Sequence, residues 1–365
     1  MKFVDLSVQQ EAIRADLDRR ISDVLSHGKY ILGPEVEEME SVLSEYVGVK
    51  HCVSVASGTE ALLIALMALG VGPGDEVVTT PFTFVATVET IVLLGAKPVF
   101  VDTEYSTANI DASRIESMIS GRTKAILPVS LYGQMADMEE INKIASRHDI
   151  PVVEDGAQSF GATFRGTRSC GISTIGCTSF FPSKPLGCYG DGGALFTDDD
   201  DIAQAFREIR VHGQSARYVH TRVGVGGRMD TLQCAVILAK WPRFQWEIEQ
   251  RQRLGERYTR LLAGQNECVG LFDIKPGRSS AYAQFTVLVR DRKRVQAKLA
   301  EAGIPTAVHY PAPLNRQPAY EGLCSENPTP VSARLGKQVM SLPMYADLSE
   351  EDQDRVVSEL LKCAV

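Results

Sequence analysis

Apolar positions in the first half of the chain follow helical and strand spacings in turn. Residues 8–26 alternate apolar and charged positions at helical spacing and predict a first helix, and a second helix is expected from Glu35 to Tyr46. The short apolar run His51–Val55 predicts a strand. It leads through Ser57-Gly58-Thr59 into an apolar helix at Ala61–Leu69.

The alternation continues to residue 155. The expected strands are Glu76–Thr80, Pro98–Val101, Ala125–Val129 and Pro151–Glu154, and the expected helices are Val85–Leu94, Ile115–Ile119 and Met138–His148. Apolar strands that alternate with helices predict an α/β fold, with a mainly parallel sheet flanked by helices on both faces.

Beyond Asp155 the pattern changes. The expected elements are short strands at Ser173–Phe181 and Gly193–Thr197, a long helix from Thr231 to about Leu262 interrupted at Pro242, a strand at Tyr282–Val289, a helix at Arg292–Ala302, a strand at Thr306–Tyr310, a surface loop at Arg316–Pro330 and a final helix at Glu350–Leu361. We therefore predict a large α/β domain over residues 1–245 and a smaller C-terminal α+β domain over residues 246–365.

Composition excludes some functions. The net charge of −8 over 365 residues argues against a nucleic-acid partner. None of the eight cysteines forms a C-x-x-C pair, and the spacing of Cys170, Cys177 and Cys188 is too irregular for a zinc site, so we expect no metal. The sequence shows no signal peptide and no apolar run that could span a bilayer, which predicts a cytoplasmic protein without a membrane partner.

Three features carry candidate chemistry. Ser57-Gly58-Thr59 stands where a helix begins, and the unpaired N–H groups there suit a phosphate, although the motif taken alone is better explained as an ordinary N-cap. Asp155 ends an apolar strand and is either a ligand-binding carboxylate or a loop cap. Lys184, in TSFFPSKPLGCYGDGG, is either a solvated loop residue or a desolvated, nucleophilic amine.

The combination of these three features narrows the choice of cofactor. The residues before Lys184 lack the glycines of a P-loop, and Gly224–Gly227 does not give G-x-G-x-x-G, so a nicotinamide enzyme is poorly supported. A phosphate anchor, an acid at a strand end and a downstream lysine are what pyridoxal 5'-phosphate requires. The sequence thus favours an enzyme that uses this cofactor.

Over nearly its whole length the sequence resembles the DegT/DnrJ/EryC1/StrS sugar aminotransferases, a branch of the aspartate aminotransferase-like fold type I. The blocks that carry the resemblance include SVASGTEAL, GDEVVTTPFTFVAT, VVEDGAQSFGA, SFFPSKPLGCYGDGGA, GRMDTLQCAV and HYPAPLNRQPAY. The resemblance implies a pyridoxal-phosphate-dependent aminotransferase. It also implies a homodimer that builds each active site from two subunits.

The resemblance implies a role for each matching residue. Gly58, Thr59 and Ser179 would hold the phosphate, Phe84 would stack on the ring, Asp155 would pair with the ring nitrogen, Gln158 would bind the ring hydroxyl, and Lys184 would be the Schiff-base lysine. The sequence departs from the family pattern at two positions. Gly226 replaces an asparagine that reaches the partner's phosphate, a contact that is lost or taken over by Arg228, and Ser130 replaces a histidine.

Within the family, PSKPLGCYGDGGALFT and VGGRMDTLQCAV look most like enzymes that aminate UDP-2-acetamido-2-deoxy-3-oxo-glucuronate, with L-glutamate as donor, for lipopolysaccharide (O-antigen) sugars. The guanidinium of Arg228 suits the sugar carboxylate, which makes this residue a candidate substrate contact. His309 and Tyr310 are further candidate substrate contacts. A structural ion pair for Arg228 and an ordinary strand hydrogen bond for His309 are the alternatives. Other readings of the chain are an aminotransferase for a different nucleotide keto-sugar or a non-catalytic nucleotide-sugar sensor.

Overall fold

A computed structural model describes residues 1–265 and 267–364, and its centre is one twisted sheet. In spatial order the strands are β3 (Lys97–Phe100), β2 (Glu76–Thr79), β4 (Thr123–Leu127), β5 (Val153–Asp155), β8 (Ile175–Ser179), β9 (Gly193–Thr197) and β1 (His51–Val55). Parallel bridges at Ile126–Val152 and Val129–Asp155 join β4 to β5. Among these described strands only β9 runs against its neighbours, which confirms the mainly parallel sheet.

Helices cover both faces of this sheet, because successive strand residues point to opposite sides. Cys52 belongs to one apolar cluster and Val53 to the other, and Val78 and Val77 are divided in the same way. The helices over the first cluster are α3 (Pro34–Val47) and α6 (Met138–Arg147), and those over the second are α4 (Gly58–Ala68), α5 (Ala86–Leu93) and α7 (Asp200–Ile209). The chain thus builds two cores, one on each face.

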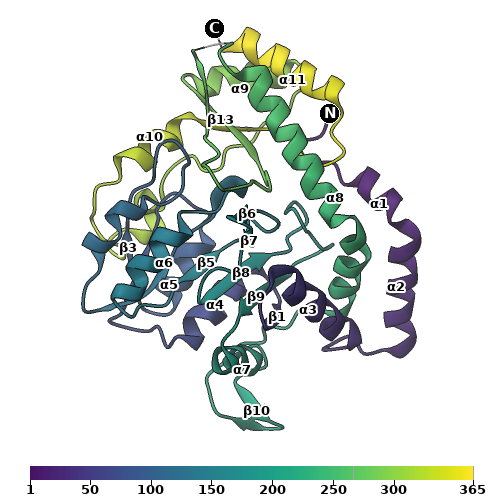
Figure 1. Cartoon of the computed structure of the whole chain (residues 1–365), viewed down its shortest axis with the longest axis vertical. Coiled ribbons are helices and arrows are strands. Elements are labelled where there is room, and N and C mark those ends of the chain that lie inside the picture. Colours follow the sequence, from purple (N-terminus) through teal and green to yellow (C-terminus); the bar gives the residue numbers. More distant parts are fainter. Residues whose placement is uncertain (266, 365) are drawn as a thin grey trace.

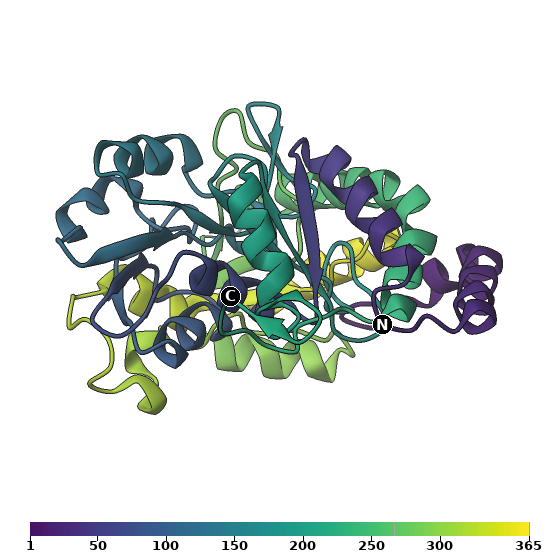
Figure 2. The ribbon, with the colours of Figure 1, turned by 90° about the horizontal axis from the view of Figure 1, so that it is seen from below.

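The N-terminal helices lie at one edge of the molecule beside α8 (Thr231–Leu262), as Figure 2 shows. Instead of one helix over residues 8–26 there are two, α1 (Ser7–Ala12) and α2 (Arg14–His27), because Ile13 leaves helical geometry at φ −108° and ψ 7°. The predicted interruption at Pro242 is wrong. α8 continues through this residue because its buried face packs against α2 and α3, and this packing outweighs the lost hydrogen bond.

A smaller antiparallel sheet lies at the top of Figure 1. Its strands are β12 (Val269–Leu271), β13 (Phe285–Val289) and β14 (Val339–Leu342), and the helices near it are α9 (Arg292–Glu301), α10 (Pro330–Gln338) and α11 (Glu350–Cys363). A separate apolar cluster underlies this sheet. The boundary predicted near residue 245 lies inside the continuous helix α8, and the division into two domains stays a prediction.

Two further expectations are wrong. Residues 306–310 form no strand: they lie along the outer edge of β14, but only Ala307 pairs with it, through a bridge to Ser341. Residues 115–119 are not one α-helix; the 3-10 turns Ala112–Arg114 and Glu116–Met118 stand there.

The remaining described strands form two short hairpins, β6 (Thr163–Phe164) with β7 (Thr167–Arg168), and β10 (Gln214–Ala216) with β11 (Val219–His220). The second hairpin projects from the body beyond α7 (Figure 1). None of the helices within residues 1–265 and 267–364 is both long and apolar enough to cross a bilayer.

Candidate active site

The predicted cofactor residues meet at one edge of the large sheet, where the parallel strands end. Asp155 is the last residue of β5 and Ser179 is the last residue of β8. β1 ends at the same edge and leads through Ser57 into α4. In open α/β sheets the carboxyl ends of the strands form the crevice that binds ligands.

Gly58 opens α4 directly against Ser179. A Cβ on Gly58 would lie 2.5 Å from the Ser179 Cβ, so any larger residue would displace this contact. Ser57 caps the helix, since its Oγ accepts a hydrogen bond from Glu60 N at 3.1 Å. The first N–H groups of a helix have no partner in the helix, and they carry the positive end of its dipole. Gly58, Thr59 and Ser179 therefore form a cradle with the shape and polarity that a phosphate needs.

Asp155 is only 6% exposed, yet it is an acid. Its Oδ2 accepts a hydrogen bond from the Thr87 hydroxyl at 2.9 Å, and its Oδ1 accepts one from Ala157 N at 3.2 Å. Burial raises the pKa of this carboxyl, while these bonds and the charge of Lys184 oppose the rise. A cationic group placed beside it, such as a protonated ring nitrogen, would stabilise its ionised form.

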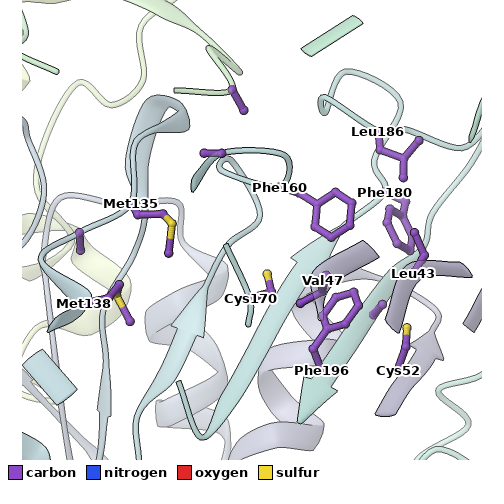
Figure 3. Close-up of a cluster of buried hydrophobic side chains, with 14 of the residues drawn as sticks. Leu43, Val47, Cys52, Met135, Met138, Phe160, Cys170, Phe180, Leu186 and Phe196 are labelled. Carbon is purple, nitrogen blue, oxygen red and sulfur yellow. The ribbon is translucent and has the colours of Figure 1, made fainter. Parts of the chain in front are cut away.

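Lys184 is half-buried and lies on the loop between β8 and β9. Its backbone N–H donates to the Phe181 carbonyl at 2.8 Å, and neighbouring Phe180 and Leu186 are buried in the apolar cluster drawn in Figure 3. Burial lowers the pKa of the Lys184 ammonium, and the negative charge of Asp155 acts in the opposite direction. Lys184 is thus a partly desolvated amine within the electrostatic reach of Asp155.

Gln158 joins the large sheet to the C-terminal part of the chain. Its Nε2 donates to the Tyr310 hydroxyl at 3.1 Å, and its Oε1 accepts from Tyr132 N at 2.9 Å. Tyr132 adopts a left-handed conformation with φ 58°, and its hydroxyl donates to the His309 carbonyl. Gln158 and Tyr132, which are far from residue 309 in the sequence, therefore fix the segment His309-Tyr310.

His309 and Tyr310 lie near the predicted cofactor residues. The Tyr310 ring is 6.1 Å from the ring of Phe84, which is 52% exposed, and His309 Nδ1 is 2.9 Å from Ser341 Oγ. Burial, with a smaller contribution from Lys184, lowers the pKa of His309 to about 4, so this ring is neutral near pH 7. Burial, followed by the charge of Asp155, raises the pKa of Tyr310. Both side chains are hydrogen-bonding groups rather than ions at neutral pH.

Arg228 lies in another part of the site, beside the first turn of α4. Its charge opposes the burial that raises the pKa of Glu60, and Glu60 Oε2 stands 2.2 Å from where a Cβ on Gly227 would lie. Among the described residues no hydrogen bond or ion pair joins Arg228 to Asp155 or to Lys184. Arg228 is therefore adjacent to the first turn of α4 but is not joined directly to Asp155 or Lys184.

Sequence reasoning missed three residues that hold this site. Thr87 binds Asp155, Tyr132 binds Gln158, and Ser341 binds His309. Thr87 could have been found, because Thr83 and Thr87 stand one helical turn apart and their hydroxyls are within 3.0 Å of each other. Ser341 gave no local signal.

Comparisons with known proteins identify the family of the chain. The model of the DegT/DnrJ/EryC1/StrS aminotransferase family matches residues 11–361. A Pseudomonas aeruginosa UDP-2-acetamido-2-deoxy-3-oxo-D-glucuronate aminotransferase is 55% identical over 345 residues, which are 94% of this chain and 95% of that protein.

Solved structures show the same fold. A family member from Brucella abortus is 39% identical, with a TM-score of 0.96 over 100% of this chain and 99% of the other. NtdA from Bacillus subtilis, solved with bound cofactor PMP, is 31% identical, with a TM-score of 0.92 over 100% of this chain and 85% of the other. These similarities confirm the predicted fold type I.

Proposed function

Because the chain belongs to the DegT/DnrJ/EryC1/StrS aminotransferase family, it is a pyridoxal-phosphate-dependent sugar aminotransferase, and we propose that it aminates C3 of UDP-2-acetamido-2-deoxy-3-oxo-glucuronate. The observation that carries the chemistry is the half-buried Lys184, whose pKa is lowered by burial and which lies within reach of the charge of Asp155. The observation that favours this sugar is the 55% identity to an aminotransferase of that name. A protein that only bound its ligand would have no use for such an amine.

The cofactor fits the residues that are present. Gly58, Thr59 and Ser179 would hold its phosphate, since the missing Cβ of Gly58 lets Ser179 lie directly against the first turn of α4. Asp155 would pair with the ring nitrogen, Gln158 with the ring hydroxyl, and Phe84 would stack on the ring. When bound, pyridoxal phosphate supplies an electron sink for the bond that breaks at the amino donor.

The protein's own contribution is to move protons and to position groups. The Lys184 amine removes the proton from Cα of the donor, for which we propose L-glutamate, and later gives a proton to the sugar carbon that receives nitrogen. Burial lowers the pKa of this amine, which favours its neutral, basic form. Donor and sugar use the same site in turn, so the kinetics should be ping-pong.

The substrate end of the site would recognise a carboxylate and hydroxyl groups. Arg228 supplies a guanidinium suited to the sugar carboxylate, while neutral His309 and Tyr310 supply hydrogen bonds. A sugar of this type would serve lipopolysaccharide or O-antigen synthesis. The six buried cysteines of the described residues carry free thiols, which is consistent with the cytoplasmic location that we propose.

We also propose a homodimer with shared active sites. The hairpin of β10 and β11 projects from the body, and nearby apolar side chains are uncovered: Tyr218 is 79% exposed and Val223 is 84% exposed. Such residues are typical of a surface that a partner covers. Arg228 follows this segment, so a second subunit docked there would bring its Arg228 close to the first subunit's site.

One experiment tests both reaction and substrate. The purified protein is loaded with pyridoxal phosphate and incubated with L-glutamate and a panel of UDP- and dTDP-linked 3-keto and 4-keto sugars, and products are identified by mass spectrometry. We expect the amino sugar from the 3-oxo-glucuronate and 2-oxoglutarate in equal amounts. Turnover of a neutral keto-sugar at a higher kcat/KM would replace the substrate, and failure of borohydride to attach cofactor to Lys184 would refute the role of this lysine.

A further inference from the structure

Lys240 is a buried lysine that the proposed reaction does not use. It lies in α8 and is 2% exposed. Its Nζ donates a hydrogen bond of 2.6 Å to the Gly187 carbonyl, and it stands 4.3 Å from the centre of the Tyr189 ring. Burying a lysine costs free energy unless partners replace its water, and the two partners here belong to the same loop.

This loop is the one that carries Lys184, three residues before Gly187. A second side chain of α8 holds it as well: Gln233 Oε1 accepts from Tyr189 N at 2.9 Å. Gln233 and Lys240 are seven residues apart, and therefore lie on the same face of the helix. α8 thus holds the loop between β8 and β9 through hydrogen bonds to Gly187 and Tyr189.

The part of the loop that α8 holds, around Gly187, is tightly folded. A Cβ on Gly187 would lie 2.5 Å from the Pro182 carbonyl oxygen, and Cys188 N donates to the Phe180 carbonyl at 2.7 Å. The chain therefore reverses around Lys184, and the Gly187 carbonyl points away from the turn toward α8. Fixing this carbonyl fixes the position from which the Lys184 side chain starts.

We propose that Lys240 is a positioning residue, whose buried ammonium anchors the Gly187 carbonyl and the Tyr189 ring and so holds Lys184 toward Asp155. The role rests on the proposed function of Lys184. A charge-assisted bond to a buried carbonyl is stronger than a neutral one, and removing the donor leaves that carbonyl without a partner.

The charged and titratable groups facing Lys240 are Glu247 on α8 and Cys188 and Tyr189 on the loop. Glu247 is already bound by Gln9 of α1 at 2.8 Å and by Arg243 at 3.0 Å. Burial lowers the pKa of Lys240 to about 8, so the ammonium form persists at neutral pH. The loop, rather than an unpaired carboxylate, is therefore its main partner.

The test compares Lys240→Met, which fills the same space without a donor, with Lys240→Arg, which keeps the charge. Lys143→Met is the matched control, because the Lys143 side chain is 68% exposed and lies on α6. Hydrogen exchange of the full chain is followed by mass spectrometry without cofactor and with saturating pyridoxal phosphate. Cofactor affinity and the yield of borohydride-trapped Lys184 are measured on the same preparations.

We expect Lys240→Met to speed exchange in residues 182–192 by about tenfold, to weaken cofactor affinity by about tenfold, and to leave exchange in β2 and α6 unchanged. Lys240→Arg should recover part of both losses, and Lys143→Met should resemble the wild type. Unchanged exchange in 182–192, or an equal rise throughout the chain, would overturn the proposal.

A second arm applies even where Lys240→Met does not fold. Gln233→Leu removes the neighbouring anchor from the same helix, so with Lys240 intact it should raise exchange at residues 188–190 by only a few-fold and keep trapped Lys184 near the wild-type yield. A Gln233→Leu loss as large as that expected for Lys240→Met would mean that Lys240 is not the anchor. Because exchange is read without cofactor, this outcome is separate from the proposed reaction. If wild-type protein never traps cofactor on Lys184, the proposed function fails instead.

Discussion

Asp155, Gln158 and Lys184 are held by contacts within one chain, whereas Arg228 lies after a projecting hairpin whose Tyr218 is 79% exposed. The first group sits where strands of the buried sheet end, so packing on both faces fixes it. The segment of Arg228 is tied to its own chain through the backbone, where Ala56 N donates to the Gly227 carbonyl at 2.9 Å, but the hairpin before it is uncovered. In the proposed dimer, one subunit would therefore supply the cofactor residues, and the subunit that covers the hairpin would complete the substrate end.

The largest effect is expected at Lys184, which belongs to the group of residues at the strand ends of the buried sheet. Lys184→Ala should lower kcat by at least about 1,000-fold, because no other described amine lies in the field of Asp155, and general acid–base groups contribute on this scale. The cofactor should stay bound through the phosphate cradle. Single-turnover assays and cofactor absorbance check the two statements separately, and near-normal turnover would contradict the assignment.

The burial of His309 can be measured through pH. Its pKa falls from 6.5 to about 4 in the folded protein, so between these pH values the unfolded chain binds more protons. Stability should therefore decrease as pH falls through this window, by up to about 3 kcal/mol. Urea unfolding of wild type and His309→Gln from pH 7.5 to 4 checks this: the difference between them should be constant above pH 6.5 and shrink below it. A constant difference throughout would mean that the ring is solvated.

At the substrate end of the site, which follows the exposed hairpin, Arg228→Met should raise KM for the carboxylated sugar by about 10- to 100-fold and leave cofactor affinity unchanged. The decisive version mixes subunits. A hybrid of Lys184→Ala and Arg228→Met chains should recover activity, since one of its two sites would combine an intact Lys184 with the intact Arg228 of the other chain. If the hybrid keeps the raised KM of Arg228→Met, Arg228 serves its own subunit, and the contrast between the two ends disappears.

Strand ends were the part of the site that the sequence could predict. β9 has the predicted bounds, Gly193–Thr197, because a fully buried strand needs an unbroken apolar run. The same logic put Asp155 at the end of β5, and the lysine loop followed from its glycines and aromatic neighbours. Local patterns thus indicated the groups that a single strand or turn positions.

The contacts between distant segments could not be predicted this way. Tyr132 meets Gln158 across 26 residues and His309 across 177. His309 was expected on a strand, but pairing of its segment with β14 stops at Ala307, and a side-chain contact to Ser341 holds the residue instead. Periodicity reports which face of an element is buried, not which element covers it, so the small sheet's part in the site became visible only in three dimensions.

The smallest predicted effect tests how firmly the Asp155 carboxylate is held in position. Thr87→Val keeps the shape of the side chain but removes the 2.9 Å hydrogen bond to Asp155 Oδ2, leaving only the Ala157 N–H on the other oxygen. Loss of one such bond to a carboxylate corresponds to about 1.5 kcal/mol, so kcat/KM for glutamate should fall by about tenfold. Thr90→Val is the matched control, because the Thr90 hydroxyl binds only carbonyls of its own helix. Equal rates for both variants would mean that Asp155 is positioned by the backbone of β5 alone.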